Sequence, residues 1–153
     1  IYRSYASLND FAAAKGIQHS EFPAWRLVEQ LNNELAAANN GVTDSRCLPL
    51  NLASTALKRV NMALRWLVRD DGIVDLGVWN VLKPSQLFIP LDVHVGNTAR
   101  SLELISRKAN DKRTTIELTD ILRSHRPDDP VWYDYALFGI GVHNPLADTQ
   151  QNI

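Results

Sequence analysis

The sequence predicts an all-α domain. Apolar residues recur mostly at spacings of three and four rather than in alternation, which is typical of helices with one buried face. Proline and glycine separate helix-length segments. The composition, 45% apolar and 22% charged, is that of an ordinary globular protein. We therefore expect one helical domain over residues 1–153, with an N-terminal helical segment (1–45) and a core (46–153).

Two helices are expected in the first half of the chain. Pro23 fits the first position of a helix, and apolar residues follow at helical spacing until Asn39-Asn40-Gly41 ends it. A second helix is predicted from about Ser54 to Arg69, closed by Asp70-Asp71-Gly72. The stretch 73–90 contains Pro84 and Pro90 and is predicted to be a short helix or irregular.

Three further helices are expected after Pro90. Asp92 is the predicted N-cap of the first, whose apolar positions are Val95, Ala99, Leu102 and Ile105. Thr114 and Glu117 have the spacing of a capping box before the next. Asp129-Pro130 predicts an N-cap and a first-position proline for a last helix that runs towards Gly139.

Several classes of site and location are disfavoured by residue counts. The only cysteine is Cys47, which excludes an internal disulfide and metal sites held by several thiolates. The four histidines show no metal-ligand spacing, so no metal is expected. No apolar run approaches the roughly 20 residues of a membrane span, and no secretory leader is visible. We therefore expect a cytoplasmic protein with no membrane partner.

Positive charge is concentrated in one segment although the net charge is −1. Residues 45–69 contain five cations and no acid: Arg46, Lys58, Arg59, Arg65 and Arg69. Clustered charge of this kind is the footprint expected of a protein that binds a phosphate backbone. A solvated helix face with nothing bound would give the same composition.

Lys58 is a candidate nucleophile on the predicted second helix. A helical wheel places Lys58, Arg65 and Arg69 on roughly the opposite side from a broad apolar arc, whose members are Ala56, Val60, Ala63, Leu64, Leu67 and Val68. The helix N-terminus and the two arginines would both disfavour a protonated amine, and a nucleophilic lysine needs a lowered pKa. The alternative is an exposed basic helix. Trp66, beside this face, is expected to be a packing residue, with a contact to DNA as the alternative.

Asp92 supplies a carboxylate that could work with this amine. An amine nucleophile and a nearby carboxylate are what imine-forming chemistry on a sugar carbon requires. By default Asp92 is simply a helix cap, and the two roles are compatible. His94 is most simply a hydrogen-bonded structural histidine. No serine or cysteine has the histidine and aspartate pattern of a hydrolase.

Two motifs resemble the helix-hairpin-helix DNA glycosylases of base-excision repair. Lys58-Arg59-Val60-Asn61 is similar to the family's Lys-x-Ala-Asn. The segment from Pro90 through Val95 is similar to the family's Pro-Val-Asp-Thr-His-Val. The long separation of lysine and aspartate is more similar to the archaeal 8-oxoguanine glycosylases, whose Lys-x-x-Asn-Tyr-Ala is matched at Lys58, Asn61 and Ala63. Most of residues 47–143 also resemble an uncharacterised bacterial family. Its Lys-Arg-Leu-Asn-Met-Phe-Leu-Arg-Trp-Met-Val-Arg is matched at most positions by Lys58 to Arg69, and its Pro-Ser-Gln-Leu by Pro84 to Leu87.

The sequence also departs from these patterns. The glycine-rich hairpin that precedes the family's lysine is replaced by Leu50 to Leu57, which contains no glycine. Asn97 stands where the family usually has an arginine. The bacterial relatives have additional chain before the position of Ile1, so we expect an N-terminal part of the glycosylase-like domain, and of its base pocket, to be missing.

The resemblance implies a fold of two helical lobes and a Schiff-base mechanism without metal or organic cofactor. Lys58 would attack C1′ of a damaged nucleotide, and Asp92 would assist. The implied partner is double-stranded DNA with an abasic site or a damaged base, an oxidised purine by analogy, and no obligate protein partner is evident. The expected DNA contacts are Arg59, Arg65, Arg69, His94 and Arg100.

Two other functions remain open at this point. The first is a catalytically inactive DNA-binding domain, favoured by the changed hairpin and the weak overall charge. The second is a structural or protein-interaction domain, in which Lys58 is a surface residue and Asp92 only a cap. Salt-dependent binding of DNA would distinguish the structural domain from the glycosylase and from the inactive DNA-binding domain. Lyase activity would distinguish the glycosylase from the inactive DNA-binding domain.

Overall fold

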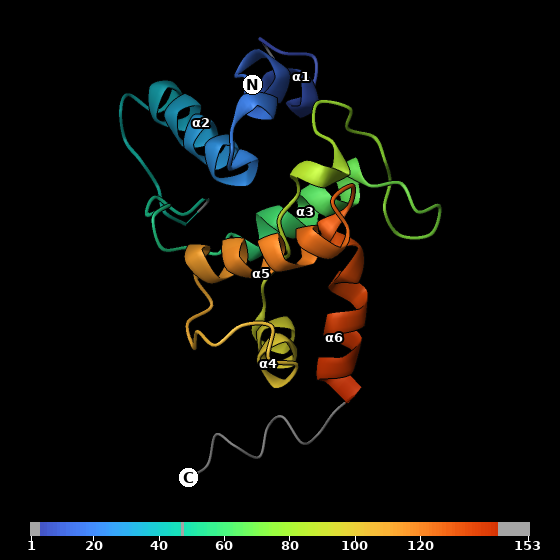
Figure 1. The fold of residues 1–153 in the computed structure, drawn as a ribbon. Helices are drawn as coiled ribbons and strands as arrows, with labels where there is room; N and C mark the ends of the chain where they lie inside the picture. Colours follow the sequence, from blue (N-terminus) through green and yellow to red (C-terminus); the bar gives the residue numbers. More distant parts are fainter. Residues whose placement is uncertain (1–3, 47, 144–153) are drawn as a thin grey trace.

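The computed structural model describes residues 4–46 and 48–143, and this part of the chain is helical, without strands beyond two isolated bridges (Figure 1). The predicted all-α class is confirmed at this level. Cys47, the only cysteine, lies outside the described residues. The elements are α1 (Leu8–Ala14), η1 (Ile17–His19), α2 (Pro23–Ala38), α3 (Lys58–Val68), η2 (Pro84–Gln86), α4 (Val93–Ser101), α5 (Lys112–His125), η3 (Pro130–Tyr133) and α6 (Asp134–His143).

Local signals fix several helix ends as predicted. Pro23 begins α2, and Asn39 ends it, followed by Gly41 in the left-handed conformation at φ 84°. Asp92 caps α4 by accepting a hydrogen bond from the Val95 amide. Helix α1 was not predicted individually; the Ser7 side chain caps it by accepting a hydrogen bond from the Asp10 backbone amide.

Three predicted helix starts are wrong. Helix α3 begins at Lys58 rather than Ser54, because Leu57 adopts a left-handed conformation at φ 49° that a helix interior cannot contain. The cap of α5 is Asp111, which accepts from the Thr114 amide, so Thr114 lies buried in the first turn instead of capping it. Asp129 and Pro130 open the short η3 rather than the last α-helix.

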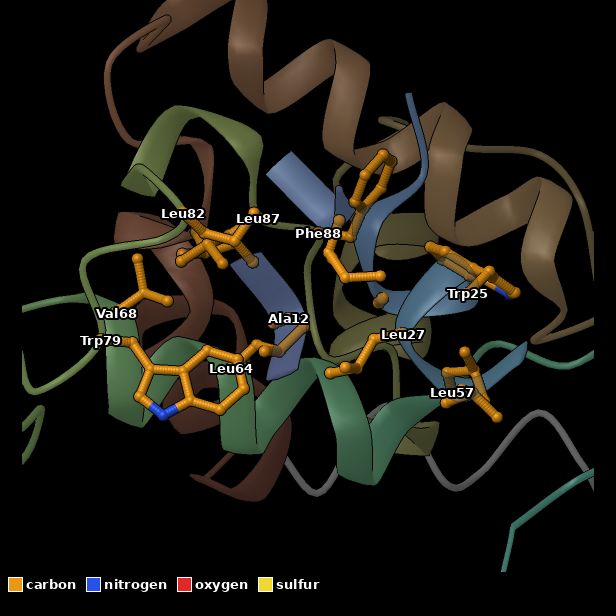
Figure 2. Packing of buried hydrophobic residues seen from close by; sticks show 14 of the residues in the cluster. Ala12, Trp25, Leu27, Leu57, Leu64, Val68, Trp79, Leu82, Leu87 and Phe88 are labelled. Carbon is orange, nitrogen blue, oxygen red and sulfur yellow. The ribbon is translucent and has the colours of Figure 1, made fainter. Parts of the chain in front are cut away.

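The buried apolar residues form two clusters. The first joins α1, α2 and α3 to the 79–88 segment, and Figure 2 shows Leu64, Val68 and Trp79 of this cluster beside Leu82 and Leu87. The second lies between α4, α5 and α6. The N-terminal segment therefore packs both on itself and on α3. The chain passes between the clusters at Ala56 and Leu57, immediately before Lys58.

Helices α4 and α6 approach closely in the lower part of Figure 1. A Cβ built on Gly141 of α6 would lie 2.7 Å from Thr98 Oγ1 and 2.8 Å from the carbonyl oxygen of His94. Both atoms belong to α4, and one of them is backbone. Only glycine therefore fits at this crossing.

Gly141→Ala is expected to destabilise the protein, whereas Gly139→Ala, two residues earlier, should not. Overpacking at Gly141 should outweigh the gain in helix propensity and lower the free energy of unfolding by about 1–2 kcal/mol. A Cβ at Gly139 meets nothing within 4 Å, so alanine there should stabilise α6 by up to about 1 kcal/mol. Urea unfolding of the two variants measures both changes in the free energy of unfolding. Equal changes in the two variants would contradict the close crossing of α4 and α6.

The loop after α3 is held by a single carboxylate. Asp71 Oδ1 accepts hydrogen bonds from the amides of Ile73, Val74 and Asp75 at 2.8–2.9 Å. These amides lower the pKa of Asp71 to about 2. The loop turns the Asp75 side chain into the protein interior, where it is fully buried.

No helix in the described part of the chain combines the length and apolar character that a membrane span requires.

Candidate functional site

Lys58 and Asp92 meet where the two clusters join. The Lys58 Nζ lies 3.3 Å from Asp92 Oδ2, although the two residues begin different helices, α3 and α4. The Lys58 side chain is 48% exposed and that of Asp92 only 10%. The amine is therefore open to solvent while its carboxylate partner is largely enclosed.

The two oxygens of Asp92 have separate partners. Oδ1 accepts from the Val95 amide at 2.8 Å and caps α4, and Oδ2 faces the lysine. The cap fixes the orientation of the carboxylate. The two roles predicted for Asp92 are therefore compatible in geometry as well as in principle.

The turn before Lys58 is fixed without glycine. The indole of Trp25 donates to the carbonyl of Thr55 at 2.9 Å, and the side-chain amide of Asn61 donates to the carbonyl of Ala56 at 3.0 Å. Leu57 is buried in the left-handed conformation that glycine usually adopts. These contacts place Lys58 at the first position of α3, with no side-chain cap before it.

A second carboxylate, Asp134, interacts electrostatically with Asp92 of the pair. Burial raises the pKa of Asp134, Arg65 opposes this shift, and the negative charge of Asp92 adds to it. Asp134 begins α6 and is ion-paired with Arg65. Asp134 was not among the predicted site residues, because it falls inside a helix predicted to begin at Asp129.

The exposed cationic face predicted for α3 is wrong at Arg65 and Arg69. Both are buried, with 1% and 8% exposure. Arg65 pairs with Asp134 and Asp75, and its guanidinium lies 3.6 Å from the centre of the Tyr135 ring. Arg69 pairs with Asp75 and with Asp129 at 2.9 Å. These arginines hold α3, the 71–75 loop and α6 together, and neither presents a surface for DNA.

This arrangement also changes the predicted surroundings of Lys58. The repulsion that Arg65 and Arg69 were expected to exert on the amine is countered by their three aspartate partners. The charge nearest to Lys58 in the described structure is instead Asp92. A carboxylate does not repel a charged amine as an arginine does, so Asp92 can assist Lys58 only as the acceptor of its proton.

Arg65→Met is expected to lower the free energy of unfolding by roughly 3–5 kcal/mol, because it leaves Asp134 buried without its cation. Arg59→Met is a matched control on the same helix: Arg59 is exposed, so the change should stay within about 0.5 kcal/mol. Adding Asp134→Asn to Arg65→Met should recover part of the loss. Equal urea midpoints for the two single variants would contradict a structural role for Arg65.

The other residues considered as DNA contacts differ in their exposure and in their neighbours. Arg59 is exposed, and no ion pair of it is found among the described residues. His94 is partly buried and packs edge-on against Phe138, with ring centres 5.6 Å apart. Trp66 is 38% exposed, so it is only partly a packing residue.

Arg100 is engaged with the loop that follows α4. Its guanidinium donates to the carbonyls of Arg107 and Lys108 at 2.6 and 2.9 Å and to Asn110 Oδ1 at 2.6 Å. Burial lowers the pKa of Arg100. Its observed role is to hold this loop, and its predicted contact with phosphate stays a prediction.

Within residues 4–46 and 48–143, no group of three potential metal ligands comes together. The Lys58–Asp92 pair itself offers an amine that can attack an electrophilic carbon and a carboxylate that can receive its proton.

A family model described as "Protein of unknown function (DUF2400)" matches residues 1–143. The chain belongs to the DUF2400 family. The function of that family is unknown, so belonging to it assigns no reaction to the Lys58–Asp92 pair. No curated protein and no solved structure is significantly similar to this DUF2400 chain.

Proposed function

We propose that this protein is a DNA repair glycosylase with abasic-site lyase activity that acts through a Schiff base on Lys58. The observation that carries the proposal is the 3.3 Å contact between a half-exposed lysine amine and a largely enclosed carboxylate. An amine that reacts with a sugar carbon must be reachable and must have a nearby group to take its proton. The resemblance of both motifs to base-excision glycosylases supports the choice of substrate.

The proposed reaction begins with proton transfer from the Lys58 amine to Asp92. The lysine nitrogen then bonds to C1′ of the damaged nucleotide while the bond from C1′ to the base breaks. The base leaves with its electron pair and takes up the proton held by Asp92, which restores the carboxylate. Opening of the sugar ring at O4′ gives an imine. Loss of a proton from C2′ and departure of the 3′ phosphate then cleave the strand.

The position of Asp92 suits this sequence of steps. Its cap bond to the Val95 amide occupies Oδ1, so Oδ2 remains available to the lysine. A carboxylate held in one orientation can also stabilise the positive charge that develops on the sugar as the base departs. Because the base must leave the duplex before the amine can reach C1′, the substrate is a flipped nucleotide or an existing abasic site.

An inactive DNA-binding domain is the second candidate. One argument for it is the turn from Leu50 to Leu57, which lacks the glycines that the base-excision glycosylases have before their lysine. The other is that a 3.3 Å contact between a lysine and an aspartate is also the geometry of an ordinary ion pair. This candidate binds duplex DNA and forms no covalent intermediate.

Borohydride trapping separates the two. The protein is incubated with a labelled duplex that carries one abasic site, and sodium borohydride reduces any imine to a stable adduct. The expected result is a covalent protein–DNA product, and digestion with mass spectrometry should locate the modification on Lys58. Binding of the duplex without any adduct would leave the inactive DNA-binding domain.

A further inference from the structure

A second basic segment lies beside the Lys58–Asp92 pair. Residues 107–113 read Arg-Lys-Ala-Asn-Asp-Lys-Arg, with four cations and one acid in seven positions. This segment lies outside the cationic run formed by residues 45–69. With Arg65 and Arg69 buried, it is the strongest basic stretch left with exposed side chains near the pair.

Contacts on two sides fix this segment next to both members of the pair. The Lys112 amide donates to the carbonyl of Ser54 at 3.1 Å, and a bridge joins Thr55 to Asp111, just before Lys58 in the chain. On the other side, the Asn110 side chain donates to the carbonyl of Asp92 at 3.2 Å. The segment therefore spans the space between the starts of α3 and α4.

The four cations of the segment divide into two structural and two free side chains. Arg107 pairs with Asp111 and donates to Thr114, and the Lys112 Nζ lies 4.7 Å from the centre of the Phe22 ring. Lys108 and Arg113 are exposed, and among the described residues neither has an ion-pair partner.

Few acids oppose these free cations. The only acid within the segment, Asp111, is already paired with Arg107, and Asp92 is paired with Lys58. Glu117, one turn beyond Arg113, lines the same surface hollow and is the nearest acid along that helix face. The segment thus presents excess positive charge on a backbone that Arg100 and Asn110 hold in place.

We propose that Lys108 and Arg113, together with Arg59 at the start of α3, form the surface that binds the phosphate backbone of duplex DNA on either side of the nucleotide at Lys58. The identity of the partner rests on the proposed function. Exposed, unpaired cations on a fixed backbone suit phosphates, because they bind by charge and release counterions without reading sequence.

Salt-dependent binding to an uncleavable duplex tests this surface. Fluorescence anisotropy is measured between 50 and 200 mM salt with a labelled duplex that contains a tetrahydrofuran abasic analogue. Replacing both Lys108 and Arg113 by glutamine should reduce the slope of log affinity against log salt by roughly two and weaken binding more than tenfold at 100 mM salt. Each single replacement should give about half the change in slope.

Lys83→Gln is the matched control, because Lys83 is exposed and lies in the 79–88 segment of the other cluster. It should leave the slope and the affinity unchanged. Lys108→Arg combined with Arg113→Lys keeps the charge and should bind like the original protein. A Lys108→Gln/Arg113→Gln protein with the original slope and affinity would overturn the proposal, and so would an equal loss in Lys83→Gln.

Trapping of the same proteins on an abasic duplex distinguishes this proposal from the proposed function. If the unchanged protein forms the adduct and the double variant keeps its salt slope, only the phosphate surface is wrong. If the slope falls as expected but no adduct forms, the surface stands and the lyase mechanism fails. If the unchanged protein shows no salt-dependent binding and no adduct, both are wrong.

Discussion

Lys58→Gln is expected to abolish the borohydride-trapped adduct. Glutamine keeps a polar side chain of similar length at the first position of α3 but has no amine with which to form an imine. Lys58 is half exposed, so the change should alter the free energy of unfolding by no more than about 0.5 kcal/mol. Trapping on an abasic duplex, with both proteins at equal concentration, measures the effect.

The neighbouring residue provides the control for this result. Arg59 is also exposed at the start of α3, and Arg59→Gln removes the same charge without removing the candidate nucleophile. Arg59→Gln should still form the adduct at saturating protein, although it should bind more weakly at high salt. An adduct that persists in Lys58→Gln would mean that another amine reacts, and it would exclude Lys58 as the nucleophile.

Asp92→Asn is expected to slow formation of the adduct by about 10²–10⁴-fold, the range of general acid–base catalysis. Asparagine cannot accept the lysine proton or stabilise a cationic sugar. It is, however, as good an N-cap as aspartate, so α4 should keep its start and its bond to the Val95 amide. Single-turnover trapping over time, at saturating protein, measures the rate.

Asp92→Ala separates the cap from the chemistry. Alanine loses both roles, so it should slow the reaction as asparagine does and also lower the free energy of unfolding by about 1 kcal/mol. If Asp92→Asn reacted at the original rate while Asp92→Ala lost only stability, Asp92 would be a helix cap and nothing more. The lysine would then need another proton acceptor.

The features that the sequence alone determined are those that depend on neighbouring residues. Helical spacing predicted the all-α class, Pro23 predicted the start of α2, and Asp92 predicted the cap of α4. Each is set within about one helical turn, by backbone geometry or by a side chain that reaches a nearby amide. The motif likeness also singled out Lys58 and Asp92, which the tertiary structure brings to 3.3 Å.

Only the tertiary structure decided which charges face solvent. A helical wheel placed Arg65 and Arg69 with Lys58 on one cationic face, yet the two arginines are buried against Asp75, Asp129 and Asp134. A wheel gives the direction of a side chain but not what covers it. Here the covering acids come from a loop and from η3 and α6, which lie far along the chain.

The same reasoning applies to the basic segment 107–113. Its charge is visible in the sequence, but its place beside Lys58 depends on pairing with Ser54 and Thr55 and on the hydrogen bond from Asn110 to the carbonyl of Asp92. Contacts between segments so far apart form only when the chain packs its two apolar clusters. The sequence therefore determined the helical class, several helix ends and the candidate amine, and packing decided which cations remain available to bind a partner.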